Sequence, residues 1–154
     1  MSLEDYEQTC MFLKNTGHIE TSSYPGEYDE LSELEKKTLH YWIEHAIQPA
    51  KQVSRHNSYD LKHYFERQTE IYTTNGQFKG AMLIAGYLPE NIETLNWLYR
   101  IKPTYDKRRF PRRALSGITL LPTYRTRPLG EIEPELQALI QKVHNSHRTQ
   151  KATT

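Results

Sequence analysis

Residues 72–87 read YTTNGQFKGAMLIAGY and contain the clearest helix signal in the chain. Thr74 and Gln77 have the spacing of a capping box, in which each side chain caps the backbone N–H of the other residue. Apolar residues follow at helical spacing, and Gly86 stands where a left-handed C-terminal cap is required. The stretch predicts a helix over about 75–85 whose core face consists of Phe78, Ala81, Met82 and Ala85.

Two further helices are predicted upstream of this stretch. Ser32 and Glu35 form another capping box, and the apolar spacing after them predicts a helix that is ended by Pro49. The second helix begins at Asn57 or Ser58. Its inward residues are expected to be Leu61, Tyr64 and Phe65, whereas Lys62, Glu66 and Arg67 are expected to face water.

The chain is predicted to form one folded domain with irregular ends. A length of 154 residues suits a single domain with its own core. Residues 1–27 are interpreted as an N-terminal arm, in which a short helix around 3–13 leads into a loop. Residues 28–147 form the helical domain, and residues 148–154 are expected to be a flexible tail.

The C-terminal half is predicted to contain a small β-hairpin and a last helix. LNWLYRIK at 95–102 alternates with the period of two that is typical of a strand. The basic loop PTYDKRRFPRR at 103–113 follows, and ALSGITLL at 114–121 could return as a second strand. The last helix begins at Pro134 and is expected to end near Asn145. The predicted fold class is therefore mainly α with a small β-hairpin, an α+β arrangement.

The order helix, helix, helix, strand, basic loop, strand is that of a winged helix-turn-helix, which binds DNA through its third helix and its wing. Asn and Gln pair with adenine, and Arg and Lys pair with guanine or phosphate. Tyr105 and Phe110 in the loop could stack on unpaired bases, so RNA or a single strand stays open as the ligand. The candidate nucleic-acid-binding residues are Asn75, Gln77, Lys79, Arg100, Lys102, Lys107, Arg108, Arg109, Arg112 and Arg113.

An alternative interpretation of helix 75–85 is plain core packing, because an apolar stripe at helical spacing is most often a core face. The distance from Arg67 to Thr74 also exceeds the tight turn of a helix-turn-helix unit. Proteins that read palindromic DNA in this way are often homodimers. The sequence leaves both a monomer and a homodimer open.

The net charge of +1 conceals a strong asymmetry. Residues 1–47 contain ten acidic and three basic side chains, a balance of −7, whereas residues 100–127 contain nine basic and one acidic side chain, a balance of +8. An electropositive face attracts polyanions. The acidic part, with Tyr6, Tyr24 and Tyr28, suits a protein partner instead. The second function left open is therefore an inhibitor of a host nucleic-acid-processing or defence complex, of the anti-CRISPR or anti-restriction type.

No pattern in the sequence indicates catalysis. The Walker A, dinucleotide-binding, C-x-x-C and H-E-x-x-H patterns are missing, so no enzyme activity, no catalytic residue, no metal and no cofactor are predicted. The one cysteine, Cys10, cannot form an internal disulfide, and the N-terminus lacks the features of a signal peptide. No apolar run reaches the roughly 18 residues of a membrane span. A cytoplasmic protein without membrane contact is expected.

The run NSYDLKHYFERQTEIYTTNGQFKGAMLIAGY, followed by NWLYRI, resembles a pattern in small uncharacterised proteins of phages and other mobile elements of Gram-positive bacteria. In that pattern S-Y-x-L-K-H leads to Y-x-x-N-G-x-F and then to A-G-Y. The resemblance covers about 45 of the 154 residues and implies a phage-like or plasmid-like origin and a compact helical unit, without a mechanism. Together these features predict a small DNA-binding module, regulatory or accessory to a mobile element. The matching residues are Ser58, Tyr59, Leu61, Lys62, His63, Tyr72, Asn75, Gly76, Phe78, Ala85, Gly86, Tyr87 and Trp97.

Overall fold

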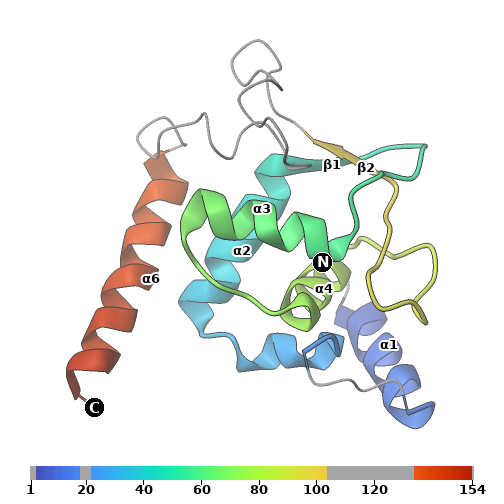
Figure 1. The fold of residues 1–154 in the computed structure, drawn as a ribbon, viewed down its shortest axis with the longest axis horizontal. Helices are drawn as coiled ribbons and strands as arrows, with labels where there is room; N and C mark the ends of the chain where they lie inside the picture. Colours follow the sequence, from blue (N-terminus) through green and yellow to red (C-terminus); the bar gives the residue numbers. More distant parts are fainter. Residues whose placement is uncertain (1–2, 18–21, 104–133, 154) are drawn as a thin grey trace.

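A computed structural model describes residues 3–17, 22–103 and 134–153 (Figure 1). This part of the chain is mainly helical and contains one two-stranded antiparallel sheet, so the predicted α+β class is confirmed. Among the helices it describes, none is both long and apolar enough to cross a membrane. The elements are α1 (Leu3–Asn15), the 3-10 helix η1 (Pro25–Glu30), α2 (Glu33–Ala46), β1 (Ile47–Pro49), α3 (Ser58–Thr69), α4 (Asn75–Ile84), β2 (Ile101–Pro103) and α6 (Pro134–Thr153).

Helix α4 is the central element of the fold. It contacts α1, η1, α2 and α3, which are the helical elements that precede it in the chain (Figure 1). Every residue of α4 except Gln77 is buried. The predicted core positions Phe78, Ala81 and Met82 are confirmed, but their neighbours Leu83 and Ile84 are buried as well. The helix therefore has no exposed face.

The predicted start and stop signals of α4 are confirmed. Thr74 Oγ1 accepts a hydrogen bond from the N–H of Gln77 at 3.0 Å, and Gln77 Oε1 accepts one from the N–H of Thr74 at 2.9 Å. Beyond the helix, Gly86 has a φ of +100°, and the N–H of Tyr87 donates to the carbonyl of Met82 at 2.9 Å. Glycine adopts this left-handed conformation without the penalty that a Cβ would bring.

The two preceding helices also begin as predicted. Ser32 and Glu35 form a complete capping box at the start of α2. Asn57 and Asp60 form another at the start of α3. Helix α2 ends at Ala46 and continues directly into β1, so its end lies close to the predicted one. Local hydrogen bonding between residues three apart explains why these starts are visible in the sequence.

Two glycines, one helical turn apart, allow the chain around η1 to lie directly on α4. A Cβ added at Gly76 would overlap the backbone of Tyr24. A Cβ added at Gly80 would overlap the carbonyl oxygen of Pro25. Only glycine has room for such a backbone approach. The segment around η1 is therefore a layer of the core and not a loop leading into it.

Both chain ends differ from the prediction. Helix α1 buries Tyr6, Cys10 and Leu13 in the core and contacts α4, so it is not a detached arm. At the other end, α6 packs against α2 and continues to Thr153. The helix therefore extends beyond the end that was predicted near Asn145 and includes residues 148–153. Apolar contacts with residues that are distant in the sequence hold both ends. A local sequence pattern does not reveal such contacts.

The sheet is not the predicted hairpin. Strand β2 pairs antiparallel with β1, so that Ile47 lies opposite Pro103. The strand predicted over 95–102 is reduced to β2, because the residues before it run as irregular chain beside the segment after β1. The predicted partner strand at 114–121 and the basic loop after Pro103 lie outside the described residues. A winged helix-turn-helix is not confirmed.

Two buried tyrosines provide a matched test of this core. Tyr99 is fully buried, burial raises its pKa well above the usual value, and its hydroxyl has no hydrogen-bond partner among the described residues. Tyr64 is equally buried, but its hydroxyl lies 2.6 Å from His56 Nδ1. Because an unpaired buried hydroxyl is costly, Tyr99→Phe should leave the free energy of unfolding unchanged or raise it, whereas Tyr64→Phe should lower it by about 1 kcal/mol. Urea denaturation of both variants measures the difference, and a larger loss in Tyr99→Phe would contradict it.

Candidate functional site

The structure places the predicted base-reading residues of α4 inside the protein. The exposed fraction of Asn75 is 6 %, and that of Lys79 is 3 %. Gln77 is half-buried, and its side-chain oxygen caps Thr74. A recognition helix reads bases with exposed side chains that reach into the major groove. The predicted exposed face of Asn75 and Lys79 is therefore absent from α4, and its burial does not support the reading of DNA by this helix.

The basic candidates outside α4 do not extend that helix into a binding surface. Arg100 is exposed, and its Nε lies 2.6 Å from Glu90 Oε1, so its charge is paired. Lys102 is exposed on β2. Because Asn75 and Lys79 are buried, they share no surface with either cation. The remaining predicted contacts lie outside the described residues: Lys107, Arg108, Arg109, Arg112 and Arg113.

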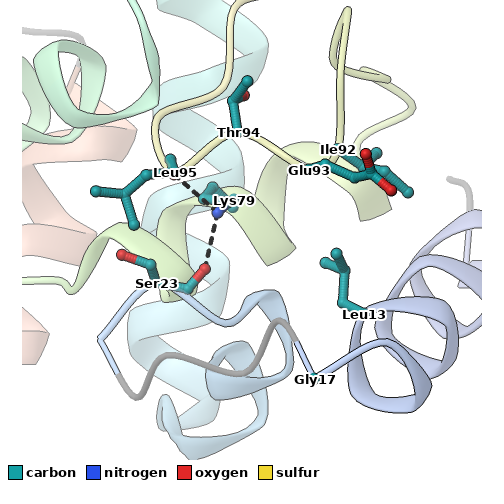
Figure 2. A pocket seen from close by; sticks show the side chains of 8 residues that line it. All are labelled: Leu13, Gly17, Ser23, Lys79, Ile92, Glu93, Thr94 and Leu95. Carbon is teal, nitrogen blue, oxygen red and sulfur yellow. Dashed lines mark hydrogen bonds between the residues drawn. The ribbon is translucent and has the colours of Figure 1, made fainter.

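Lys79 connects two loops. Its Nζ donates hydrogen bonds to the carbonyl oxygens of Ser23 at 2.8 Å and Leu95 at 3.0 Å (Figure 2). The ammonium also lies 4.4 Å from the centroid of the Trp97 ring. A buried charge requires compensation of this kind, from carbonyl dipoles and from an aromatic face. Lys79 therefore fastens the segment before η1 to the segment that follows α4.

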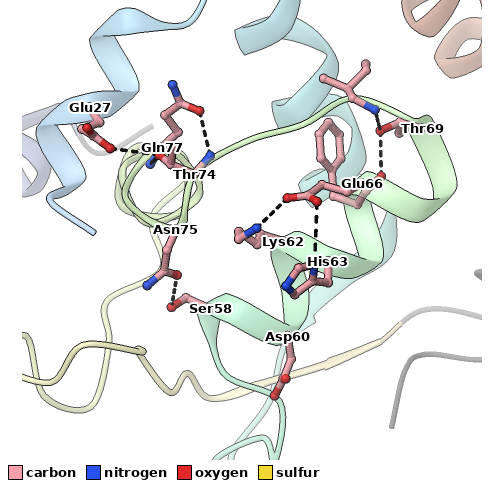
Figure 3. A network of polar contacts seen from close by, with 12 residues as sticks. Glu27, Ser58, Asp60, Lys62, His63, Glu66, Thr69, Thr74, Asn75 and Gln77 are labelled. Carbon is pink, nitrogen blue, oxygen red and sulfur yellow. Dashed lines mark hydrogen bonds and ion pairs between the residues drawn. The ribbon is translucent and has the colours of Figure 1, made fainter. Parts of the chain in front are cut away.

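Asn75 connects the same region to the start of α3. Its Oδ1 accepts a hydrogen bond from Ser58 Oγ at 2.8 Å (Figure 3). Its Nδ2 donates to the carbonyl of Leu95 at 3.2 Å and to Asn96 Oδ1 at 3.0 Å. Ser58 Oγ in turn accepts the backbone N–H of Trp97 at 3.0 Å. These four hydrogen bonds join segments that are far apart in the sequence. The network that they form therefore orients the loop that follows α4.

The connected segments form the wall of a pocket of about 430 Å³. It lies at the starts of α3 and α4, beside the loop that carries Asn96. We name it the tyrosine pocket and define it by six of its lining residues: Ser22, Tyr59, Lys62, Tyr72, Asn75 and Asn96. Concave sites that combine aromatic surface with a few polar groups are typical of ligand binding.

Two tyrosines at this pocket expose large aromatic surfaces. The exposed fraction is 47 % for Tyr59 and 69 % for Tyr72. The ammonium of Lys62 lies 5.1 Å from the centroid of the Tyr59 ring and 5.3 Å from that of Tyr72. This cation–π geometry places the two rings beside the same charge. The rings therefore offer flat, polarised surfaces on which a planar ligand could stack.

Lys62 was expected to face water, but its exposed fraction is only 5 %. Its Nζ lies 2.6 Å from Glu66 Oε1, one helical turn further along α3 (Figure 3). His63 Nδ1 lies 3.7 Å from the other oxygen of Glu66. Burial, reinforced by repulsion from Lys62, lowers the pKa of His63, so the neutral imidazole is favoured. The charge of Lys62 is therefore balanced mainly by Glu66.

The sequence-based reasoning did not identify this pocket. Tyr59, Lys62, Tyr72 and Asn75 lie within 17 positions of one another in the sequence, but their shared location at the pocket depends on how α3 and α4 pack. The feature of the sequence that could have indicated the pocket is the concentration of Tyr, Lys, His and Asn in two short motifs, which lie just before a helix or in its first turn. In the part of the chain that the structure describes, no group of three or more His, Cys, Asp or Glu residues could hold a metal ion.

The buried ion pair supports an asymmetric stability prediction. The side chain of Lys62 is 6 % exposed and that of Glu66 is 18 % exposed. Glu66→Gln leaves the more deeply buried charge without its carboxylate and should lower the free energy of unfolding by about 1–3 kcal/mol. Lys62→Met keeps the apolar stem and leaves a carboxylate that water can reach, so it should cost about 1 kcal/mol or less. Thermal and urea unfolding measure both, and the opposite order would contradict the assignment.

Comparison with known proteins does not add a function to this geometry. No protein-family model, no curated protein and no solved structure matches the chain. The function must therefore be argued from the residues of the tyrosine pocket and from the charge distribution of the chain.

Proposed function

We propose that the protein binds single-stranded nucleic acid, without catalysing a reaction, as a regulatory or accessory factor. An unpaired base stacks at the tyrosine pocket, and the basic segment 100–127 contacts phosphates. The exposed rings of Tyr59 and Tyr72 beside a polar pocket are the observation that supports this proposal most directly. The resemblance to proteins of phages and mobile elements suggests the biological setting.

Stacking accounts for the aromatic part of the site. A base that stacks on an aromatic side chain contributes about 1–3 kcal/mol to binding. Tyr72 exposes more of its surface than any other large hydrophobic side chain of the described residues, and Tyr59 lies at the same pocket. Exposed aromatic side chains that gather in one place are a mark of interaction sites. A flat, polar base fits both the rings and the hydrogen-bonding groups between them.

The positive charge of residues 100–127 explains how the protein would bind the phosphates of a nucleic acid. Residues 100–127 contain nine basic side chains and one acidic side chain. Each cation that neutralises a phosphate releases counterions, and affinity then falls steeply as salt rises. Lys102, at the start of this segment, is exposed. The described part of this segment ends at Pro103 in β2, and Asn96 at the pocket precedes β2 in the chain.

A single strand fits this site better than a duplex. Bases inside a duplex have their faces covered by neighbouring bases, so an aromatic side chain in a pocket cannot stack on them unless they are flipped out. Reading a duplex from the major groove requires an exposed helix or ribbon, and α4 is buried. The unstacked bases of a single strand present both a face for the tyrosines and an edge for the polar groups.

Substitution of the most exposed ring tests the proposal. Tyr72→Ala should weaken binding to a single-stranded oligonucleotide by about 5- to 100-fold at constant salt, because one stacking contact is lost. Tyr72→Phe should retain most of the affinity, since the ring is kept. Leu88→Ala, an equally conservative loss of an exposed apolar side chain away from the pocket, is the matched control. Fluorescence anisotropy measures all four proteins.

The salt dependence separates the two parts of the interface. The combined variant Arg108→Ala/Arg109→Ala/Arg112→Ala should flatten the plot of log K against log salt, whereas Tyr72→Ala should lower the curve without changing its slope. Absence of binding to any single strand at low salt would refute the proposed function. Tighter binding to duplex than to single strand would refute the role of the pocket.

A protein partner is the second candidate function, and the surface of α1 favours it. Leu3, Met11 and Phe12 are large, exposed apolar side chains on this helix, and Glu4 and Glu7 are exposed beside them. An acidic and apolar helix face suits the basic groove of a nucleic-acid-processing protein. In this case the protein acts as an inhibitor that occupies the groove in place of nucleic acid.

The surface of α1 can be tested separately from the pocket. Met11→Ser/Phe12→Ser should abolish the copurification of a stable host partner with the tagged protein, because the apolar anchors of the interface are lost. Tyr72→Ala, which does not alter α1, should retain that partner. If the wild-type protein copurifies with no stable partner, or if the α1 variant retains it, the inhibitor hypothesis fails.

A further inference from the structure

We infer that the tyrosine pocket selects bases that present a keto oxygen, such as uracil, thymine and guanine, over bases that present an amino group at the same edge. This inference rests on the proposed function and deepens it. It follows from the direction of the hydrogen bonds behind the pocket, which leaves the amide N–H groups of Asn96, which are donors, without a partner among the described residues.

Each hydrogen bond of the network has a defined donor and acceptor, because the group at one end can only donate and the group at the other end can only accept. The backbone N–H of Trp97 can only donate, so Ser58 Oγ accepts from it and donates its own proton to Asn75 Oδ1. The carbonyl of Leu95 can only accept, so the Nδ2 of Asn75 must face it. The same Nδ2 donates to Asn96 Oδ1 at 3.0 Å. The orientation of the Asn96 amide is therefore fixed, with its oxygen turned toward Asn75.

This orientation leaves the Nδ2 of Asn96 as a donor at the pocket. Its two N–H groups have no hydrogen-bond partner among the described residues, and the side chain is half-buried, so a ligand can reach it. Lys62 is also a donor only, and one of its three N–H groups is used by Glu66. Donors of both kinds require an acceptor on the ligand.

Three carbonyl groups beside the pocket already accept hydrogen bonds. The carbonyl oxygens of Leu95 and Ser23 accept hydrogen bonds from Lys79 Nζ. The carbonyl of Ser22 accepts the backbone N–H of Gly76 at 2.9 Å. An amino group placed against the Asn96 amide would therefore meet a donor where it needs an acceptor, and an unpaired polar group in a partly desolvated site costs affinity. A keto oxygen at the same position can accept from Asn96.

Uracil and cytosine provide the sharpest comparison. Both are single six-membered rings, and at C4 uracil has a keto oxygen whereas cytosine has an amino group. Fluorescence anisotropy with oligodeoxyuridine and oligodeoxycytidine of equal length, at one salt concentration, measures the selectivity of the full chain. We expect the uracil oligomer to bind roughly tenfold more tightly, because a well-placed base contact discriminates by about that factor.

Asn96→Asp tests the residue that causes the selectivity. Aspartate keeps an oxygen for Asn75 but replaces the free donor with an acceptor, so the ratio of the two affinities should fall to about one or invert. Asn91→Asp is the matched control, because it adds the same charge in the same loop, keeps the oxygen that accepts the N–H of Glu93, and lies away from the pocket. It should weaken both oligomers equally and leave the ratio unchanged.

The remaining outcomes overturn the inference in distinguishable ways. Equal affinity of the wild-type protein for both oligomers refutes keto selection but leaves binding of a single strand intact. Another outcome combines two results: the wild-type protein binds the uracil and cytosine oligomers with equal affinity, and inorganic phosphate displaces them more readily from it than from Asn96→Asp. The N–H groups of Asn96 then bind a phosphate oxygen and not a base. If neither oligomer binds, the proposed function fails and keto selection fails with it. An unchanged ratio in Asn96→Asp refutes the role of that residue.

Discussion

Burial of α4 on every side is the constraint on which the rest of the structure depends. Four helical elements pack around it, and two glycines allow the chain before η1 to approach its backbone. A helix enclosed in this way can keep polar residues only if each finds a partner. Asn75 and Lys79 satisfy that requirement by binding the loops on either side. The core of the fold therefore determines the position of the loops that form the tyrosine pocket.

The same requirement gives the pocket its chemical character. The buried donors Asn75 and Lys79 of α4 need acceptors, and the carbonyl groups of Leu95 and Ser23 supply them. The carbonyl groups of Leu95 and Ser23 accept these hydrogen bonds, and the amide N–H groups of Asn96 are left without a partner among the described residues. The tyrosines add stacking surface, which depends little on salt, whereas phosphate contacts depend on it strongly. In the function that we propose, affinity for the nucleic-acid backbone is thereby separated from selection of a base.

Much of the local structure could be predicted from the sequence, and most of the site could not. The apolar spacing located the helices. The alternation of Leu95, Trp97, Tyr99 and Ile101 located three residues that are buried, although Leu95 is exposed and only Ile101 lies in a strand. Asn75 and Lys79 were assigned to an exposed face because helical spacing places polar residues opposite the apolar stripe. That inference fails for a helix that is covered on both sides, since spacing does not report how many neighbours a helix has.

By itself, the sequence determined where helices begin and end. The capping boxes at Ser32 and Thr74 and the left-handed turn at Gly86 depend on residues at most a few positions apart, so the local chain specifies them. Only the tertiary structure decided that β2 pairs with β1, that α4 lies inside, and that the tyrosines of two motifs meet at one pocket. These features arise from packing and hydrogen bonds between distant segments, whose free energies exist only after the chain has folded around α4.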